Sequence, residues 1–269
     1  MQKYFYELTI TPSSNIEVFS DLLFSLTQSA IEERDNSLIV RDEESLDNIA
    51  WAINEFSKKI DIQIKTSLEK KANEDWIKKY QDSIKAIEIG DFYIRPEWES
   101  QKDNKIDIII NPALAFGSGH HESTSSCLTC LQKYVTKGNT LLDVGCGSGI
   151  LAIASAKIGA IVDICDSDEL AIQSAKENFE LNSVNFNEAW VGSANKASKK
   201  YDIVVANIIA DIIILIKDDL KNSLKDDGIL ILSGIITKYC SKVLENFSEF
   251  KTIENIKKGD WHTLVLKKG

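Results

Sequence analysis

The chain lacks an excess of positive charge. Of its 269 residues, 31 are Lys or Arg and 41 are Asp or Glu, which gives a net charge of −10. A protein that binds nucleic acid needs a basic surface to neutralise phosphates. We therefore expect no direct contact with nucleic acid, whereas a basic protein would be a suitable partner.

Long uncharged apolar runs are also missing. A helix that spans a bilayer needs about 20 consecutive apolar residues, and no segment of this chain reaches that length. The first ten residues, MQKYFYELTI, do not show a charged stretch followed by an apolar one. We expect no membrane span, no secretory signal and a cytoplasmic location.

Cysteines are few and odd in number, and a chain of this length does not need disulfides to fold. The five cysteines are therefore expected to be free thiols. Cys127 and Cys130 form a CxxC pattern, but no second pair accompanies them, and helical packing is favoured over metal or redox use. His120 and His121 lie nearby without a third ligand, so no metal site is predicted.

The first 62 residues indicate a small α+β domain. Its 12 acidic and 5 basic side chains are read either as a solvated surface or as a docking face for a basic partner. Strand-like segments alternate with helical apolar stripes in the order of a ferredoxin-like domain. The expected strands are 4–10, 37–40 and 60–64, and the expected helices are 15–30 and 46–56.

Residues 63–98 are expected to form a linker. The segment 67–81 is rich in Lys and Glu with few apolar residues, and a helix that is polar nearly all round often bridges domains. The segment 87–96 is predicted to be a strand pair or an extended arm.

Residues 99–269 predict a larger α/β domain. Continuous apolar strands alternate with helices, which indicates a parallel sheet covered on both faces. A final hairpin, turning at residues 257–260, would place one antiparallel strand at the sheet edge, as is typical of class I methyltransferases. The expected strands are 107–111, 140–144, 160–166, 201–207, 228–233 and two near 250–257 and 261–267; the expected helices are 122–135, 149–158, 168–182, 210–224 and 238–248.

The strongest local signal is a glycine-rich turn after a buried strand. In LLDVGCGSGILAIA (141–154), Gly145, Gly147 and Gly149 follow Asp143 at a spacing of two. Glycines let the chain turn sharply and let a ligand approach the backbone. A dinucleotide loop would place its third glycine at Ile150. The observed spacing instead resembles the methyltransferase loop that receives S-adenosylmethionine, although a purely structural turn is the alternative.

Two further strand ends carry polar residues. Asp166 could accept hydrogen bonds from ribose hydroxyls or could cap the next helix. Asp168 is better placed as the cap, which leaves Asp166 for the ribose. Asn207 is either a cap or a ligand contact. Methyltransferases that modify nitrogen often carry an Asn here, but the Pro-Pro-Tyr that commonly follows is replaced by Ile208 and its neighbours.

The segment NPALAFGSGHHESTSSCL (111–128) combines a proline turn, an apolar patch and a hydroxyl-rich helix start. Such a loop can cover a bound cofactor. Thr124 is placed either to cap the helix or to touch that cofactor.

These segments together resemble the ribosomal protein L11 methyltransferase (PrmA) family. The resemblance is most specific over 111–131 and continues through the glycine turn, DSDELAI, VVANIIAD and LILSGI (230–235). His121 and Thr124 match the family pattern, whereas Asn111, Ala113 and the pair Glu122–Ser123 depart from it.

The resemblance implies an N-terminal domain that recognises the ribosomal protein, a linker, and a Rossmann-like domain that binds S-adenosylmethionine. The implied activity is methyl transfer to lysine side chains and the N-terminal amine of ribosomal protein L11. The sequence leaves the oligomeric state open, with a monomer favoured. The implied cofactor contacts are Thr124, Gly145, Asp166 and Asn207, and Asn207 is also the implied catalytic residue. A nicotinamide-dependent oxidoreductase and a cofactor-binding module without catalysis are the alternatives.

Overall fold

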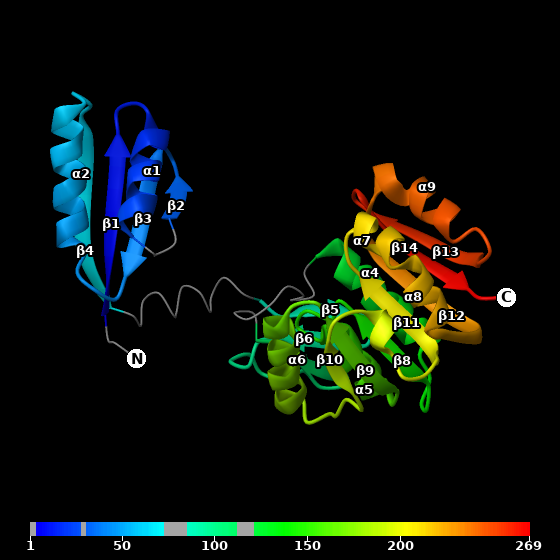
Figure 1. The fold of residues 1–269 in the computed structure, drawn as a ribbon. Helices are drawn as coiled ribbons and strands as arrows, with labels where there is room; N and C mark the ends of the chain where they lie inside the picture. The colour runs from blue at the N-terminus through cyan, green and yellow to red at the C-terminus, as the bar shows by residue number, and fades with distance from the viewer. Residues whose placement is uncertain (1–3, 28–30, 73–84, 112–120) are drawn as a thin grey trace. The chain divides into compact units, whose positions relative to one another are not determined.

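The protein forms two compact units, Met1–Ser83 and Ile84–Gly269, in a computed structural model (Figure 1). The structure describes residues 4–27, 31–72, 85–111 and 121–269. Within these residues, no helix is both long enough and apolar enough to cross a bilayer.

The first unit has the βαββαβ order of a ferredoxin-like domain. Its four strands pair antiparallel in the order β2-β3-β1-β4. Alternate residues of the strands, such as Leu8 and Val40, form one buried core with Phe19, Leu23 and Ile53 of the helices. The elements are β1 (Tyr4–Pro12), α1 (Ile16–Leu26), β2 (Ile31–Arg34), β3 (Ser37–Asp42), α2 (Asp47–Lys59) and β4 (Ile64–Ala72).

The predicted linker helix is wrong where the structure describes it, because residues 64–72 form strand β4. This strand pairs with β1 along its whole length. Ile64 and Leu68 contact the core. Lys65 and Glu69 lie on the other face of this edge strand, where charge is tolerated. The strand predicted at 60–64 is also wrong for most of its length. Helix α2 ends at Lys59, and the chain then turns, with Asp61 in the left-handed region at φ 53°.

The second unit is built on a seven-stranded sheet of order β10-β9-β8-β11-β12-β14-β13 (Figure 1). Neighbouring strands are parallel from β10 through β9, β8 and β11 to β12. Strand β14 is antiparallel to both its neighbours, β12 and β13. The antiparallel strand therefore lies one place inside the edge, because β13 is outermost. The strands are β8 (Thr140–Val144), β9 (Ile161–Asp166), β10 (Ala189–Val191), β11 (Tyr201–Asn207), β12 (Leu224–Ile236), β13 (Lys251–Lys258) and β14 (Trp261–Lys267).

Helices cover both faces of this sheet, as the sequence predicts. One buried core joins the sheet to α4 (Glu122–Tyr134), α5 (Ile150–Ile158) and α6 (Glu169–Leu181). The other joins it to α7 (Ala210–Leu215), α8 (Lys217–Asn222) and α9 (Thr237–Asn246). The single helix predicted over 210–224 is thus two short helices that meet at Ile216.

A separate three-stranded sheet opens the second unit. It contains β5 (Ile87–Ile89), β6 (Phe92–Arg95) and β7 (Ile106–Ile109) in the order β5-β6-β7. The strand pair expected at 87–96 is therefore present, but the strand expected at 107–111 pairs with β6 and not with the large sheet. The division at Ser83 differs from the predicted domains 1–62, 63–98 and 99–269, because β4 belongs to the first unit and β5 and β6 to the second.

Candidate functional site

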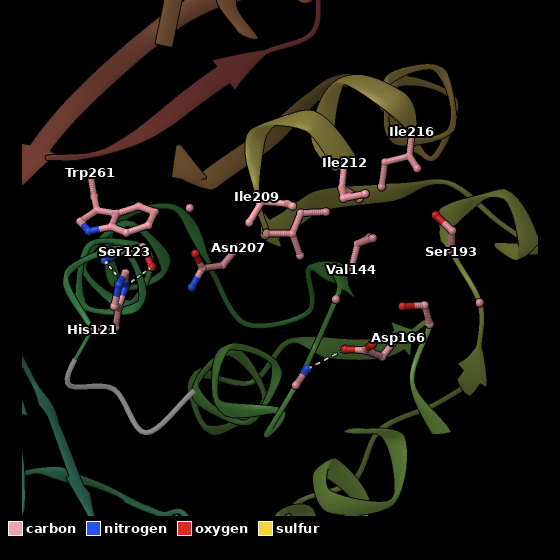
Figure 2. Close-up of a pocket in the computed structure, with 16 residues that line it drawn as sticks. His121, Ser123, Val144, Asp166, Ser193, Asn207, Ile209, Ile212, Ile216 and Trp261 are labelled. Atoms are coloured by element: carbon pink, nitrogen blue, oxygen red, sulfur yellow. Dashed lines mark hydrogen bonds between the residues drawn. The ribbon is translucent and has the colours of Figure 1, made fainter. Parts of the chain in front are cut away.

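A cavity of about 680 Å³ lies at the carboxyl edge of the seven-stranded sheet (Figure 2). Ligands of open α/β sheets bind at this edge, and the volume is within the range of small-molecule sites. Residues at the carboxyl ends of β8, β9, β10 and β11 contribute to its wall. The lining residues are His121, Ser123, Val144, Gly145, Gly147, Asp166, Ser167, Gly192, Ser193, Asn207, Ile208, Ile209, Ile212, Ile216, Gly234 and Trp261.

The glycine-rich turn forms one wall of the cavity. The backbone N–H groups of Gly145 and Cys146 both donate to the carbonyl oxygen of Cys165, at 2.8 and 3.1 Å, which turns the chain away from β8. Gly145 has φ 73°, and a Cβ at this position would lie 2.4 Å from Cγ2 of Ile208. The turn therefore requires glycine here, and it presents bare backbone to the cavity.

Asp143 lies in β8, two residues before Gly145, and is only 1% exposed. Its Oδ2 accepts a hydrogen bond from the backbone N–H of Ala152 at 3.2 Å. Its Oδ1 has no hydrogen-bond partner among the described residues. Burial, with a smaller contribution from the charge of Asp166, raises the pKa of the Asp143 carboxyl to about 7.

Asp166 ends β9 and faces the cavity (Figure 2). Its two oxygens accept backbone N–H groups from Gly147 and Asp168, both at 3.0 Å. Each carboxylate oxygen retains capacity for another hydrogen bond. Asp168 accepts the N–H of Leu170 at 2.9 Å and begins α6, so the prediction that Asp168 is the helix cap is confirmed.

Asn207 ends β11 and also lines the cavity, between Trp261 and Ile209 (Figure 2). Its Nδ2 donates to Oγ1 of Thr124 at 3.1 Å. Thr124 itself is 1% exposed and is not part of the cavity wall. His121 caps α4 by accepting the N–H of Ser123, so the helix cap is not the role of Thr124.

The structure adds residues that the sequence analysis did not single out as ligands. The rings of His121 and Trp261 meet edge to face, with centroids 4.7 Å apart, on one side of the cavity. On another side, the Ser193 hydroxyl is buried and has no hydrogen-bond partner in the described part of the chain. Ser193 follows β10, a three-residue strand too short to be recognised, and Trp261 reaches the site only through the tertiary fold.

The cysteines pack in the interior. All five are free and buried. Burial raises the pKa of Cys130 to about 12 and that of Cys127 further, so neither thiol ionises near neutral pH. Across the residues that the structure describes, no group of three or more His, Cys, Asp or Glu side chains is arranged to hold a metal ion.

The fold and the site together define a class I methyltransferase. The evidence is the parallel sheet with β14 inserted antiparallel, the glycine turn after β8 and the carboxylate at the end of β9. By its sequence, the chain belongs to the ribosomal protein L11 methyltransferase (PrmA) family, whose model matches residues 14–269. The cofactor of this family is S-adenosylmethionine, which rules out the oxidoreductase alternative.

Relatives match the chain along almost its entire length. A ribosomal protein L11 methyltransferase from Nitratiruptor sp. is 50% identical over 99% of this chain and 97% of its own length. One from Campylobacter fetus is 49% identical, over 99% of this chain and 98% of its own. The crystal structure of the ribosomal protein L11 methylase from Lactobacillus delbrueckii subsp. bulgaricus superposes with a TM-score of 0.65 at 31% identity, covering 68% of this chain and 99% of that one.

Proposed function

We propose that this protein transfers methyl groups from S-adenosylmethionine to amino groups of ribosomal protein L11, namely lysine side chains and the N-terminal amine, in the cytoplasm. The observation that carries the proposal is the cavity that brings Gly145, Asp166 and Asn207 together at one sheet edge, in a chain of the L11 methyltransferase family.

The residues of the cavity fit the cofactor. The bare backbone at Gly145 allows close approach, and the Asp166 carboxylate can accept both ribose hydroxyls. The buried, unpartnered hydroxyl of Ser193 offers a further polar contact. Gly145, Asp166 and Asn207 would hold the cofactor, which supplies a methyl group activated by a sulfonium charge.

The charge of the cavity suits two cationic reactants. No Lys or Arg is present among its sixteen described lining residues, and Asp166 is the one carboxylate. A sulfonium and an incoming ammonium group would therefore meet no repelling side chain in this wall.

The acceptor nitrogen must lose a proton before it can attack a methyl group. A lysine amine has a pKa of about 10.4 in water. The isoleucines Ile208, Ile209 and Ile212 provide an apolar surround next to Asn207, and enclosure by apolar groups lowers the pKa of an amine. The carboxamide of Asn207 can accept an N–H of the neutral amine and align its lone pair. The released proton passes to water, so no strong protein base is required.

A transfer assay tests the proposal. The purified enzyme, S-adenosylmethionine labelled in its methyl group and isolated L11 should give label in L11, located on lysine or N-terminal amines by mass spectrometry. The Asn207→Ala variant should lose most of this activity. Absence of label in L11, or label on carboxylates or hydroxyls instead of amines, would refute the proposed substrate or reaction.

A further inference from the structure

Helix α7 and the residues at its two ends are more apolar than their packing requires. The segment 208–216, IIADIIILI, has one charged residue, and a helix that is apolar nearly all round is normally buried. The side chains of Ala210 and Ile213 are buried and join the core that α7 shares with the large sheet. Other apolar side chains of this segment are left at the surface.

Three of these side chains are large and exposed. Ile209 is 63% exposed, Ile212 is 40% exposed and Leu215 is 76% exposed. They follow one another at a spacing of three residues, which makes neighbours of successive side chains on a helix surface. Elsewhere in the described part of the second unit, no stretch of seven residues contains three exposed large apolar side chains. These three residues, which we call the α7 patch, form the kind of exposed apolar surface that marks an interaction site.

The α7 patch extends from the cavity to the outside of the protein. Ile209 and Ile212 line the cavity, and Ile209 lies beside Asn207 (Figure 2). Leu215 is not among the described lining residues. The patch is therefore part of the rim of the cavity, with its inner end next to the site proposed for the acceptor amine and its outer end beyond the cavity.

A protein substrate must come close to this rim. Its acceptor amine is carried on the four-carbon stem of a lysine, or directly on the first residue of the chain. When that amine lies next to Asn207, the residues around it on the substrate surface are held within about one side-chain length of the cavity mouth. The outer end of the α7 patch is then in reach of those residues.

The charges next to the patch favour an apolar contact. Asp211 is one helical turn before Leu215, and its Oδ1 lies 3.5 Å from Nζ of Lys242 in α9. The two opposite charges offset each other, so little net charge remains beside Leu215. The surface that fits the patch is therefore apolar, and attraction of basic groups is not its role.

We propose that the α7 patch binds apolar side chains of the substrate protein that lie next to the acceptor amine. Leu215 contributes to the affinity for that protein without contacting the cofactor or the amine. This inference rests on the proposed function, because it assigns the partner of the same site.

Substitution of Leu215 tests the outer end of the patch. Leu215→Gln keeps the length and the helix propensity of the side chain but removes its apolar end. We expect KM for L11 to rise about fivefold, with kcat and the Kd for S-adenosylmethionine unchanged within about twofold. Leu215→Met stays apolar and should keep KM near that of the unchanged protein. Raising the NaCl concentration should not reduce the effect of Leu215→Gln, because salt screens charges and not apolar contacts.

Leu170→Gln is the matched control. Leu170 lies in α6, is 74% exposed and is not among the described lining residues of the cavity. Its substitution should leave KM, kcat and Kd unchanged. An equal rise of KM in the two Gln variants would overturn the proposal in favour of a general loss of apolar surface. An unchanged KM in Leu215→Gln, or a loss confined to kcat or to cofactor affinity, would also overturn it.

Cross-linking identifies the occupant of the patch. Benzoylphenylalanine in place of Leu215 in the full chain, irradiated with L11 and S-adenosylhomocysteine present, should couple to the surface of L11 around a methylated amine. The same group in place of Leu170 should not couple to L11. Coupling from position 215 to a second copy of this chain, or to a part of L11 remote from every methylated amine, would overturn the proposal.

Failure of the proposed function gives a different result from failure of this inference. If L11 is not the substrate, the unchanged protein transfers no label to L11, and both proposals fall. If the α7 patch alone is wrong, the unchanged protein labels L11 and Leu215→Gln does so with the same KM.

Discussion

At the scale of single residues, two neighbouring aspartates have separate tasks. Asp166 binds the N–H of Gly147 and faces the cavity, whereas Asp168 caps α6. The sequence predicted this division from position, because a strand end and a helix cap require different residues. It could not predict that Ser193 and Trp261 would line the same cavity, since their proximity arises from the packing of distant strands.

Substituting these two aspartates should therefore have different effects. Asp166→Ala removes the carboxylate assigned to the ribose and one anchor of the glycine turn, so the Kd for S-adenosylmethionine should rise by at least about tenfold. Asp168→Ala should reduce the free energy of unfolding by about 1 kcal/mol with little change in Kd. Calorimetry and denaturant unfolding measure both quantities. Equal cofactor affinity in the two variants would contradict the assignment of Asp166.

A second residue-scale prediction concerns Asp143 and pH. Its pKa of about 7 in the folded protein lies above the ordinary value of 3.8. Between these values the folded state binds more protons than the unfolded state, so this group lowers stability as pH rises from about 4 to 7. Between pH 5 and pH 8, the free energy of unfolding of the wild type should fall by about 3 kcal/mol relative to Asp143→Asn.

Denaturant unfolding of both proteins from pH 5 to pH 8 measures the difference between their free energies of unfolding. The contributions of the other titrating groups largely cancel, because the two proteins share those groups. Parallel stability curves would show that Asp143 is not protonated more readily in the folded protein.

At the scale of secondary-structure elements, the sequence predicted the strands whose conformation is determined by their own residue pattern. Strands β8, β11 and β14 have the predicted bounds because each is a short apolar run between turn residues. Strand β4 was missed because its Lys and Glu residues favour a helix locally, while pairing with β1 decides its conformation. The position of β14, one place inside the edge of the large sheet, also depends on its pairing with β12 and β13 and not on its own residue pattern.

The reassignment of β4 predicts where the first unit can be separated. A fragment of residues 1–83 contains all four strands and should unfold cooperatively on heating, as followed by circular dichroism. A fragment of residues 1–62, ending at the boundary first predicted, lacks β4 and should be largely unfolded, because β1 would lose its antiparallel partner on one side. Comparable melting of both fragments would contradict the role of β4.

At the scale of the whole molecule, the negative charge is concentrated in the first unit. Residues 1–83 contain 16 acidic and 10 basic side chains, so this unit carries −6 of the total −10 in less than a third of the chain. An acidic unit of this kind attracts a basic protein and raises the rate of encounter.

This charge predicts a salt-dependent reaction. Raising NaCl from about 50 to about 500 mM should lower kcat/KM for L11 several-fold, because salt screens attraction between exposed charges. The Kd for S-adenosylmethionine should change much less, since its contacts are local. Initial rates at low L11 concentration and calorimetry at the same salt concentrations provide the comparison. A kcat/KM independent of salt would exclude electrostatic attraction as a factor in substrate encounter.

The central claim is that the cavity beside Gly145 holds the sulfonium nucleoside, and a crystal grown with S-adenosylhomocysteine tests it most directly. We predict density along the carboxyl edge of the large sheet, with the ribose hydroxyls within hydrogen-bond distance of Asp166 and the homocysteine sulfur on the side of Asn207. Density for the nucleoside at another place, or none in this cavity at saturating concentration, would contradict the account.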